Sequence, residues 1–334
     1  MTLPILTVVG ALGNQGRGVV SAFLEDKAQL KVHIRALTSN PSSESAQELA
    51  KNPNVSVVQV DLTSAESIES ALQGSTYIFA NTSFDPATFI AQGAKAAEEL
   101  ENTHKLNITR AASKVATLKH LVWSTLPDAK AASGGKYHIP HFQSKVAADE
   151  LVLDAKSGLS DKTTFLRIGV YGSNLLRVPH RPVYYPDTAT HIVQYPVGPD
   201  VKFAFIGDEV TNTGIYTRAI LEQPEKTIGR IIVGVADYLS CTEWAAIFQK
   251  VQDKLGSGSK VSFKECSLTE YEEKWGGIGT EIGLMMCYFN EFGERSFTTT
   301  TWGWPVITAG DLGIEHDLRS TEETMLGLEW PAHN

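Results

Sequence analysis

The segment "ILTVVGALGNQGRGVVSAFLED" constrains the fold more than any other part of the chain. An apolar run that suits a buried strand leads directly into Gly10, Gly13 and Gly16, and a helical pattern follows. In this setting the first glycine permits a tight turn, the second a close approach of the backbone to a pyrophosphate, and the third close packing of helix on strand. The N-terminus of the helix then faces the phosphates. The spacing is GxxGxxG, one residue longer than GxGxxG, and between a strand and a helix it predicts a dinucleotide-binding loop.

Apolar runs and helical patterns alternate along the first half of the chain, and the last of them predict a helix from about Gln143 to Ser157 and a strand over 163–171. Strands separated by helices predict βαβ units with right-handed crossovers, so we expect an α/β fold with a Rossmann-like doubly wound parallel sheet. After residue 175 the chain is richer in Pro and aromatic residues and less periodic, which indicates a second, smaller α/β lobe. We therefore assign residues 1–175 to an NAD(P)-binding Rossmann-like domain, rejoined by about 204–235. Residues 176–203 and 236–334 are assigned to a smaller substrate-binding lobe.

Composition argues against several classes of protein. The net charge is −9 and the Lys and Arg residues form no long run, so we expect no direct binding of nucleic acid. No apolar run approaches the roughly 18 residues of a membrane-spanning helix, and we expect no membrane partner. Leu3–Val9 contains Pro4 and lacks a basic flank, which favours a strand over a signal peptide. Cys241, Cys266 and Cys287 are odd in number and have no CxxC spacing, so we expect a reducing, cytoplasmic location.

The end of the second predicted strand bears on which dinucleotide would bind. An acidic residue there would bind the ribose 2′-hydroxyl of NAD(H) and reject the 2′-phosphate of NADP(H). The strand ends "RALTSN", with Thr38 and Ser39 and no acid, and Arg35 lies nearby. NADP(H) is therefore the favoured cofactor. Since no arginine occupies position 39, NAD(H) is the alternative.

Several motifs in order along the chain carry a family resemblance. "VVGALGNQGRGVV", "IRALTSNP", "HLVWSTLPDA", "HFQSK" and "RIGVYGSNLL" together resemble the NmrA-like family, an atypical branch of the short-chain dehydrogenase/reductases. The resemblance implies a Rossmann-like domain and a small lobe that form a cleft. The dinucleotide contacts that it implies are Gly10, Leu12, Gly13, Asn14, Gln15, Gly16, Arg35, Thr38, Ser39, Asp61, Leu62, Asn81, Thr82, Ser83, Lys145, Tyr171, Gly172, Ser173 and Asn174. Such families include cofactor-sensing regulators, transcriptional co-regulators and reductases, so the family alone does not decide whether chemistry occurs.

The stretch "YHIPHFQSKV" holds the candidate catalytic groups. Lys145 suits the role of a lysine that holds the nicotinamide ribose and supports a nearby acid. Related reductases carry a tyrosine four residues before such a lysine, where this chain has His141. His141 is either a proton donor or a non-catalytic residue of a cofactor sensor, and Tyr137, in a glycine-rich loop, is the second candidate donor. Ser124 ends the fifth predicted strand, where related reductases place a hydroxyl that polarises the substrate.

Aromatic residues are numerous after residue 175. The set is Tyr184, Tyr185, Trp244, Trp275, Tyr288, Phe289, Trp302 and Trp304. Tyr184–Tyr185 and Trp302–Trp304 lie in aperiodic, Gly/Pro-rich segments, where side chains often line clefts, although core packing is the alternative for each. This favours an apolar or aromatic small molecule as substrate. His138 and His141 have no Cys or acidic ligand cluster beside them, so we expect no metal site.

These observations lead to three hypotheses about function. The first is an NADP(H)-dependent oxidoreductase that acts on a bulky aromatic or polycyclic small molecule, for instance in secondary metabolism. The second is a catalytically silent NAD(P)-sensing regulator that binds a protein partner and has a nuclear location as an option. The third is an enzyme that uses its bound cofactor for a non-redox or cyclisation step.

Overall fold

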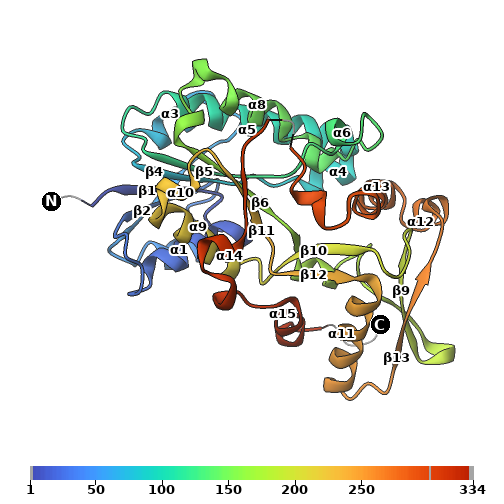
Figure 1. Ribbon diagram of the computed structural model, residues 1–334. Coiled ribbons are helices and arrows are strands. Elements are labelled where there is room, and N and C mark those ends of the chain that lie inside the picture. The colour runs from blue at the N-terminus through green and yellow to red at the C-terminus, as the bar shows by residue number, and fades with distance from the viewer. Residues whose placement is uncertain (1–2, 301, 331–334) are drawn as a thin grey trace.

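The computed structural model describes residues 3–300 and 302–330. An eight-stranded sheet forms its centre, with the order β14-β11-β6-β5-β4-β1-β2-β3, and each of its pairings is parallel (Figure 1). Its strands are β1 (Ile5–Val9), β2 (His33–Thr38), β3 (Val55–Gln59), β4 (Tyr77–Ala80), β5 (His120–Thr125), β6 (Thr163–Ile168), β11 (Ile231–Gly234) and β14 (Val306–Ile307). The order reverses between β1 and β4, and an open parallel sheet binds ligands beyond the carboxyl ends of its strands at such a point. The Rossmann-like fold predicted from the sequence is therefore confirmed.

Helices cover both faces of this sheet (Figure 1). The first domain contains α1 (Asn14–Leu24), α2 (Glu44–Leu49), α3 (Ala65–Leu72), α4 (Pro86–Gln92), α5 (Ala94–Ser113), α6 (Ala129–Ala132), α7 (Pro140–Gln143), α8 (Val146–Leu153), α9 (Thr211–Glu222), α10 (Pro224–Thr227) and α14 (Ala309–Leu312). Because side chains alternate along a strand, Val122 of β5 packs with α1 and α9, whereas Trp123 packs with α3, α5 and α8. The helices α1 and α9 approach closely at Gly18, where an added Cβ would lie 1.8 Å from the Val210 carbonyl oxygen.

The smaller lobe has a core of its own. It contains two three-stranded sheets, β12-β10-β7 and β13-β9-β8. Its elements are β7 (Val170–Tyr171), β8 (Val183–Tyr185), β9 (Thr190–Tyr195), β10 (Lys202–Gly207), β12 (Asp237–Ser240), β13 (Lys260–Glu265), α11 (Cys241–Lys254), α12 (Leu268–Trp275), α13 (Gly277–Phe292) and α15 (Thr321–Gly327). Trp244, Tyr288 and Phe289 lie buried in this core, so these aromatic residues stabilise the lobe and do not line a cleft.

Three details differ from the expectations drawn from the sequence. The strand expected over 163–171 breaks at Gly169, where an added Cβ would lie 2.6 Å from the Ala204 carbonyl oxygen, and its second part joins the smaller lobe. The helix expected near 143–157 is the shorter helix α8, which begins at Val146, and Lys145 separates it from the preceding short helix α7. Within 236–334, β14 and α14 pack with the large sheet, because the chain crosses back after α13.

Candidate functional site

The glycine loop joins β1 to α1 at the carboxyl edge of the large sheet. Gly10 has φ +75, and an added Cβ at Gly16 would lie 2.1 Å from the Gly10 carbonyl oxygen, so both positions require glycine. Gly13 is the N-cap of α1, and no side chain caps the helix. The N–H groups of the first turn are therefore directed toward the strand ends without a side-chain acceptor, which is the arrangement that binds a phosphate.

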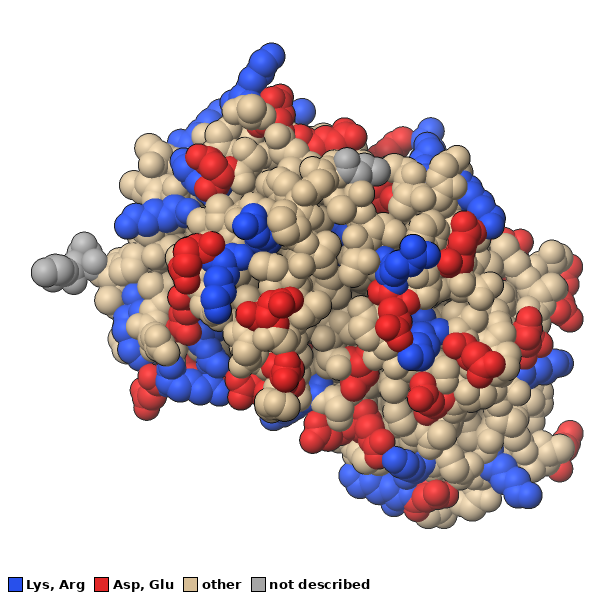
Figure 2. Space-filling view, in the orientation of Figure 1, with Lys and Arg blue, Asp and Glu red and all other residues tan. Residues whose placement is uncertain are grey.

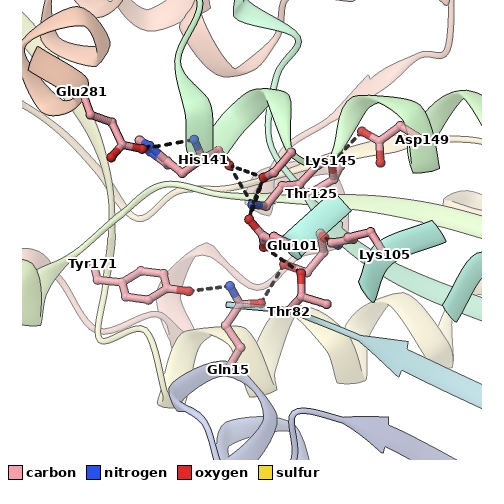
Figure 3. Close-up of polar contacts among 12 residues, drawn as sticks. Gln15, Thr82, Glu101, Lys105, Thr125, His141, Lys145, Asp149, Tyr171 and Glu281 are labelled. Carbon is pink, nitrogen blue, oxygen red and sulfur yellow. Dashed lines mark hydrogen bonds and ion pairs between the residues drawn. The ribbon is translucent and has the colours of Figure 1, made fainter. Parts of the chain in front are cut away.

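Gln15, the second residue of α1, connects this loop to strands of two different sheets (Figure 3). Its amide nitrogen Nε2 donates to the Tyr171 hydroxyl at 2.6 Å, and its Oε1 accepts from Ser124 Oγ at 2.7 Å. Tyr171 belongs to β7 and Ser124 to β5. Burial raises the pKa of Tyr171 to about 12, so its hydroxyl stays protonated at neutral pH. One amide thus holds the strand ends around the loop in a fixed arrangement.

A buried carboxylate makes a second connection between the start of α1 and the segment that follows β7. Glu209 is 4% exposed, and its Oε1 accepts from Asn14 Nδ2 at 2.9 Å and from Ser173 Oγ. Asn14 is the first residue of α1, and Ser173 lies in the turn after β7. The polar side chains of both residues are therefore occupied by the protein.

Glu101 of α5 and Lys145 form a buried ion pair with the Lys145 ammonium 2.8 Å from Glu101 Oε2 (Figure 3). Thr82 Oγ1 donates to Glu101 Oε1 at 2.7 Å, and Ser144 Oγ donates to Oε2 at 2.6 Å. Burial opposes the ionisation of Glu101, but the Lys145 charge and these hydrogen bonds outweigh it and lower the pKa of Glu101 to about 2. Glu101 is therefore a carboxylate at neutral pH, and Lys145 is its counter-ion.

The hydrogen bonds of Lys145 decide what it can still bind. Its Nζ donates to Glu101 at 2.8 Å and to the His141 carbonyl oxygen at 2.7 Å, whereas Ser144 Oγ lies at 3.4 Å. An ammonium has three N–H donors. Two of them are used in short bonds, so the third, weakly bonded one is the donor that a ribose hydroxyl could engage.

A second pair of charges lies one helical turn deeper. Lys105 of α5 is fully buried, with its ammonium 3.9 Å from the centre of the Trp123 ring and bonded to the Ser124 carbonyl oxygen. Asp149 of α8 accepts from Trp123 Nε1 and from Thr125 Oγ1, both at 2.6 Å. Burial lowers the pKa of Lys105 and raises that of Asp149. Together the two groups bind three consecutive residues of β5 and fix the strand end that carries Ser124.

His141 and Tyr137 both contact α13 of the smaller lobe. His141 Nδ1 lies 2.8 Å from Glu281 Oε1, which also accepts from the His141 backbone N–H at 3.1 Å (Figure 3). The Tyr137 hydroxyl donates to Glu291 at 2.9 Å, and its ring packs on Tyr288. Among the hydrogen bonds of the described residues, none joins Tyr137 to Lys145. The structure therefore brings His141 close to Lys145 and directs the Tyr137 hydroxyl to α13.

Arg35 lies away from the glycine loop. It is in the middle of β2, and its Nη1 donates to the carbonyl oxygens of Ala71 at 3.0 Å and Gln73 at 2.7 Å, at the C-terminus of α3. These carbonyls have no partner within the helix, which explains why a guanidinium binds there. The other predicted positions follow the carboxyl ends of strands: Leu12 after β1, Thr38 and Ser39 at the end of β2, Asp61 and Leu62 after β3, Asn81, Thr82 and Ser83 after β4, and Gly172, Ser173 and Asn174 after β7.

A cavity of about 310 Å³ lies apart from these residues. Its lining comprises Asp128, Ala131, Ala132, Arg167, Thr299, Thr300 and Trp302. Trp302 and Trp304 pack on Phe165 with ring centroids 5.4 and 4.9 Å away, so both contribute to the core of the large domain.

Within residues 3–300 and 302–330, His, Cys, Asp and Glu form no cluster of three or more that could hold a metal ion. Over the same residues, no helix combines the length and apolar character needed to cross a membrane.

Sequence reasoning missed five charged residues of this region. They are Glu101, Lys105, Asp149, Glu209 and Glu281. Glu281 has a usable signal, because it is the one acid in the apolar stretch "IGTEIGLMMCYF" and is 3% exposed. The others occur in segments where acids and lysines are frequent, and no local pattern distinguishes a buried one from a solvated one.

The chain is similar to known proteins over nearly its whole length. The family model described as the NmrA-like family matches residues 4–315. The NmrA-like family domain-containing oxidoreductase FrzB of Cladobotryum sp is 28% identical over 260 residues, which cover 75% of this chain and 74% of that protein.

Solved structures agree with this match at the level of the fold. NmrA, a negative transcriptional regulator solved in complex with NADP, superimposes with a TM-score of 0.72 at 20% identity, over 98% of this chain and 96% of that one. The Citrobacter sp. triphenylmethane reductase complexed with NADP(H) superimposes with a TM-score of 0.65 at 18% identity, over 97% of this chain and 99% of that one. Since the family model extends over more than nine-tenths of the residues, from the glycine loop to beyond β14, the chain belongs to the NmrA-like family.

Proposed function

We propose that the protein is an NADP(H)-dependent oxidoreductase that reduces a bulky aromatic or polycyclic small molecule, such as a product of secondary metabolism. The observation that carries the proposal is the convergence of the uncapped N-terminus of α1, Ser124 and Lys145 at the carboxyl ends of the strands. Figure 3 shows Gln15 of this helix end and Lys145. The relative FrzB is named an oxidoreductase, and two proteins of the same fold have been solved with NADP or NADP(H).

The residues present fit a nicotinamide dinucleotide. The first turn of α1 has N–H groups free for a pyrophosphate, and the third N–H of Lys145, which is only weakly bonded to Ser144, can turn to a ribose hydroxyl. Thr38 and Ser39 place no carboxylate at the end of β2, which supports NADP(H) over NAD(H). When bound, the nicotinamide supplies a hydride, and the protein must position the substrate and deliver a proton. Phe84, 6.1 Å from the His141 ring between ring centroids, gives the site an apolar surface that suits an aromatic substrate.

The surface is consistent with a small-molecule substrate. On the face shown in Figure 2, Lys and Arg are interspersed with Asp and Glu, and no continuous basic patch is visible. A phosphate backbone binds to an extended basic surface, so direct binding of nucleic acid is not part of the proposal.

The first test is cofactor binding by isothermal titration of NADPH and NADH. We expect NADPH to bind more tightly, and Lys145→Ala to weaken NADPH by about tenfold, as the loss of one charge-assisted hydrogen bond would. Lys119→Ala is the matched control, because Lys119 is exposed at the opposite end of β5, and it should bind as the wild type does. Equal affinity of Lys145→Ala and wild type would remove Lys145 from the proposed site.

The second test is turnover. NADPH consumption is followed by absorbance with a panel of aromatic ketones, imines and triphenylmethane dyes. Consumption with at least one member supports the proposal. Binding of NADPH without any consumption, together with a cofactor-bound structure whose nicotinamide is covered by protein, would refute it. That outcome would favour the second candidate, a cofactor-sensing regulator with a protein partner, which the fold shared with the transcriptional regulator NmrA supports.

A further inference from the structure

The contact between His141 and Glu281 joins the two lobes at the candidate site. His141 lies in α7, which follows β5 of the large domain, and Glu281 lies in α13 of the smaller lobe. The two residues are 140 positions apart in the sequence. Glu281 is 3% exposed, whereas the His141 side chain is 20% exposed. The imidazole is therefore anchored on its buried side and still reaches solvent.

The hydrogen bonds of Glu281 determine which nitrogen of the imidazole carries the proton. Its Oε1 accepts from the His141 backbone N–H at 3.1 Å, and a backbone N–H can only donate. The same oxygen lies 2.8 Å from Nδ1, so Nδ1 donates to a carboxylate. In the neutral imidazole Nδ1 then carries the hydrogen, and Nε2 is the nitrogen with the lone pair.

A carboxylate on one nitrogen of a histidine is how many enzymes orient the other nitrogen. The two bonds to one oxygen hold both the backbone and the ring of His141, so the direction of Nε2 is set by α13. The His141 carbonyl oxygen accepts from Lys145, which fixes the same residue from its other side. His141 is thus held by both lobes at once, next to the lysine that the proposed function assigns to the cofactor.

We propose that Glu281 is a positioning residue that holds His141 as the Nδ1–H tautomer, so that Nε2 delivers the proton in the reduction. This inference rests on the proposed function. In the step, the substrate atom that becomes negative as the hydride arrives takes the proton from Nε2 of the imidazolium. The imidazolium returns to the neutral Nδ1–H form and is reprotonated by water.

The tautomer can be measured without a substrate. Full-length protein labelled with ¹⁵N-histidine gives long-range ¹H–¹⁵N spectra that distinguish Nδ1–H from Nε2–H, and His141→Phe identifies the signals of His141. We expect Nδ1–H in the wild type. In Glu281→Ala we expect loss of that preference, whereas Glu281→Gln, which keeps an acceptor oxygen, should retain it.

Glu291→Ala is the matched control. Glu291 is the other α13 carboxylate that contacts this segment, through Lys136 and Tyr137, and its loss should leave the His141 tautomer unchanged. An Nε2–H tautomer in the wild type, or an unchanged His141 spectrum in Glu281→Ala, would overturn the inference.

Kinetics separate this inference from the proposed function. With a substrate found in the panel, Glu281→Ala should lower kcat by about a hundredfold, with little change in KM or in NADPH affinity. A wild-type kcat in Glu281→Ala would overturn the inference while leaving the reductase intact. Conversely, a protein that binds NADPH, shows the Nδ1–H tautomer and never consumes NADPH would refute the reductase and with it the proton-transfer role.

Discussion

The buried pair of Glu101 and Lys145 should contribute strongly to stability, and one substitution can measure that contribution. Replacing Lys145 by Met removes the counter-ion but leaves an apolar side chain of similar length. The pKa of Glu101 is lowered from 4.5 to about 2, which at 1.36 kcal/mol per pH unit corresponds to about 3 kcal/mol of stability above pH 4.5. Because the folded pKa is lower than the unfolded one, this contribution is present at neutral pH and is lost as the pH falls from 4.5 toward 2.

In Lys145→Met the Glu101 carboxylate keeps its bonds to Thr82 and Ser144 but loses the charge that offsets burial. Breaking a buried pair in this way costs about 3–5 kcal/mol, and we expect that loss in urea unfolding at about pH 7. The cost should shrink at about pH 5, because a carboxylate without its counter-ion is more easily protonated. The double variant Glu101→Gln/Lys145→Met should recover much of the loss, since it leaves no unpaired buried charge.

The control is Lys95→Met, which removes an exposed lysine 3.7 Å from Glu99 with side chains that are 88% and 69% exposed. Such an exposed pair contributes at most about 0.5 kcal/mol to the free energy of unfolding. A loss below about 1 kcal/mol in Lys145→Met, or a double variant no more stable than the single one, would refute the view that Glu101 is ionised and buried.

Three further predictions concern the loop, the amide bridge and the deeper charges. Gly16→Ala should abolish tight NADPH binding in titration and lower stability by several kcal/mol, because the new Cβ would lie 2.1 Å from a carbonyl oxygen; Gly13→Ala, at 3.3 Å, should be milder. Gln15→Ala leaves two hydroxyls without their amide partner and should cost about 1–3 kcal/mol in urea unfolding; a neutral result would contradict the bridge. Burial lowers the pKa of Lys105 from 10.5 in the unfolded chain to about 7 in the folded protein. Between these pH values the unfolded chain binds more protons than the folded protein, so the contribution of this group to the free energy of unfolding rises with pH. The stability of wild type relative to Lys105→Met should therefore increase from about pH 7 to about pH 9, by at most about 1.4 kcal/mol per pH unit.

The parts of the fold that local patterns control could be predicted from the sequence. The glycine loop and the strand–helix alternation depend on residues close together in the chain, and the structure confirms the Rossmann-like sheet that they imply. The break at Gly169 could not be predicted, because it is caused by the approach of Ala204 from another strand. The two-residue strand β14 was missed since it is too short to show a period.

The same distinction between local patterns and tertiary contacts applies to the candidate site. The positions after the strand ends could be located from the sequence, because parallel strands bring their carboxyl ends to one edge. Side-chain partners could not, and Glu281 and Glu101 illustrate the reason. Each reaches its partner across a tertiary contact, 140 residues away for His141 and 44 for Lys145. Arg35 is a further example, because its guanidinium donates to the Gln73 carbonyl oxygen at the end of α3 and not to the loop after β2.

The strand order has a consequence for synthesis on the ribosome. The free edge of β6 is paired only by β11, which begins at Ile231, and β11 in turn is paired by β14, which begins at Val306. A nascent chain that has already built β1 to β6 therefore exposes an unpaired, apolar sheet edge while some 60 further residues emerge before β11. Such an edge is a template for pairing with other chains. The topology thus leaves the growing polypeptide open to such pairing until β11 has been made, whatever the stability of the finished protein.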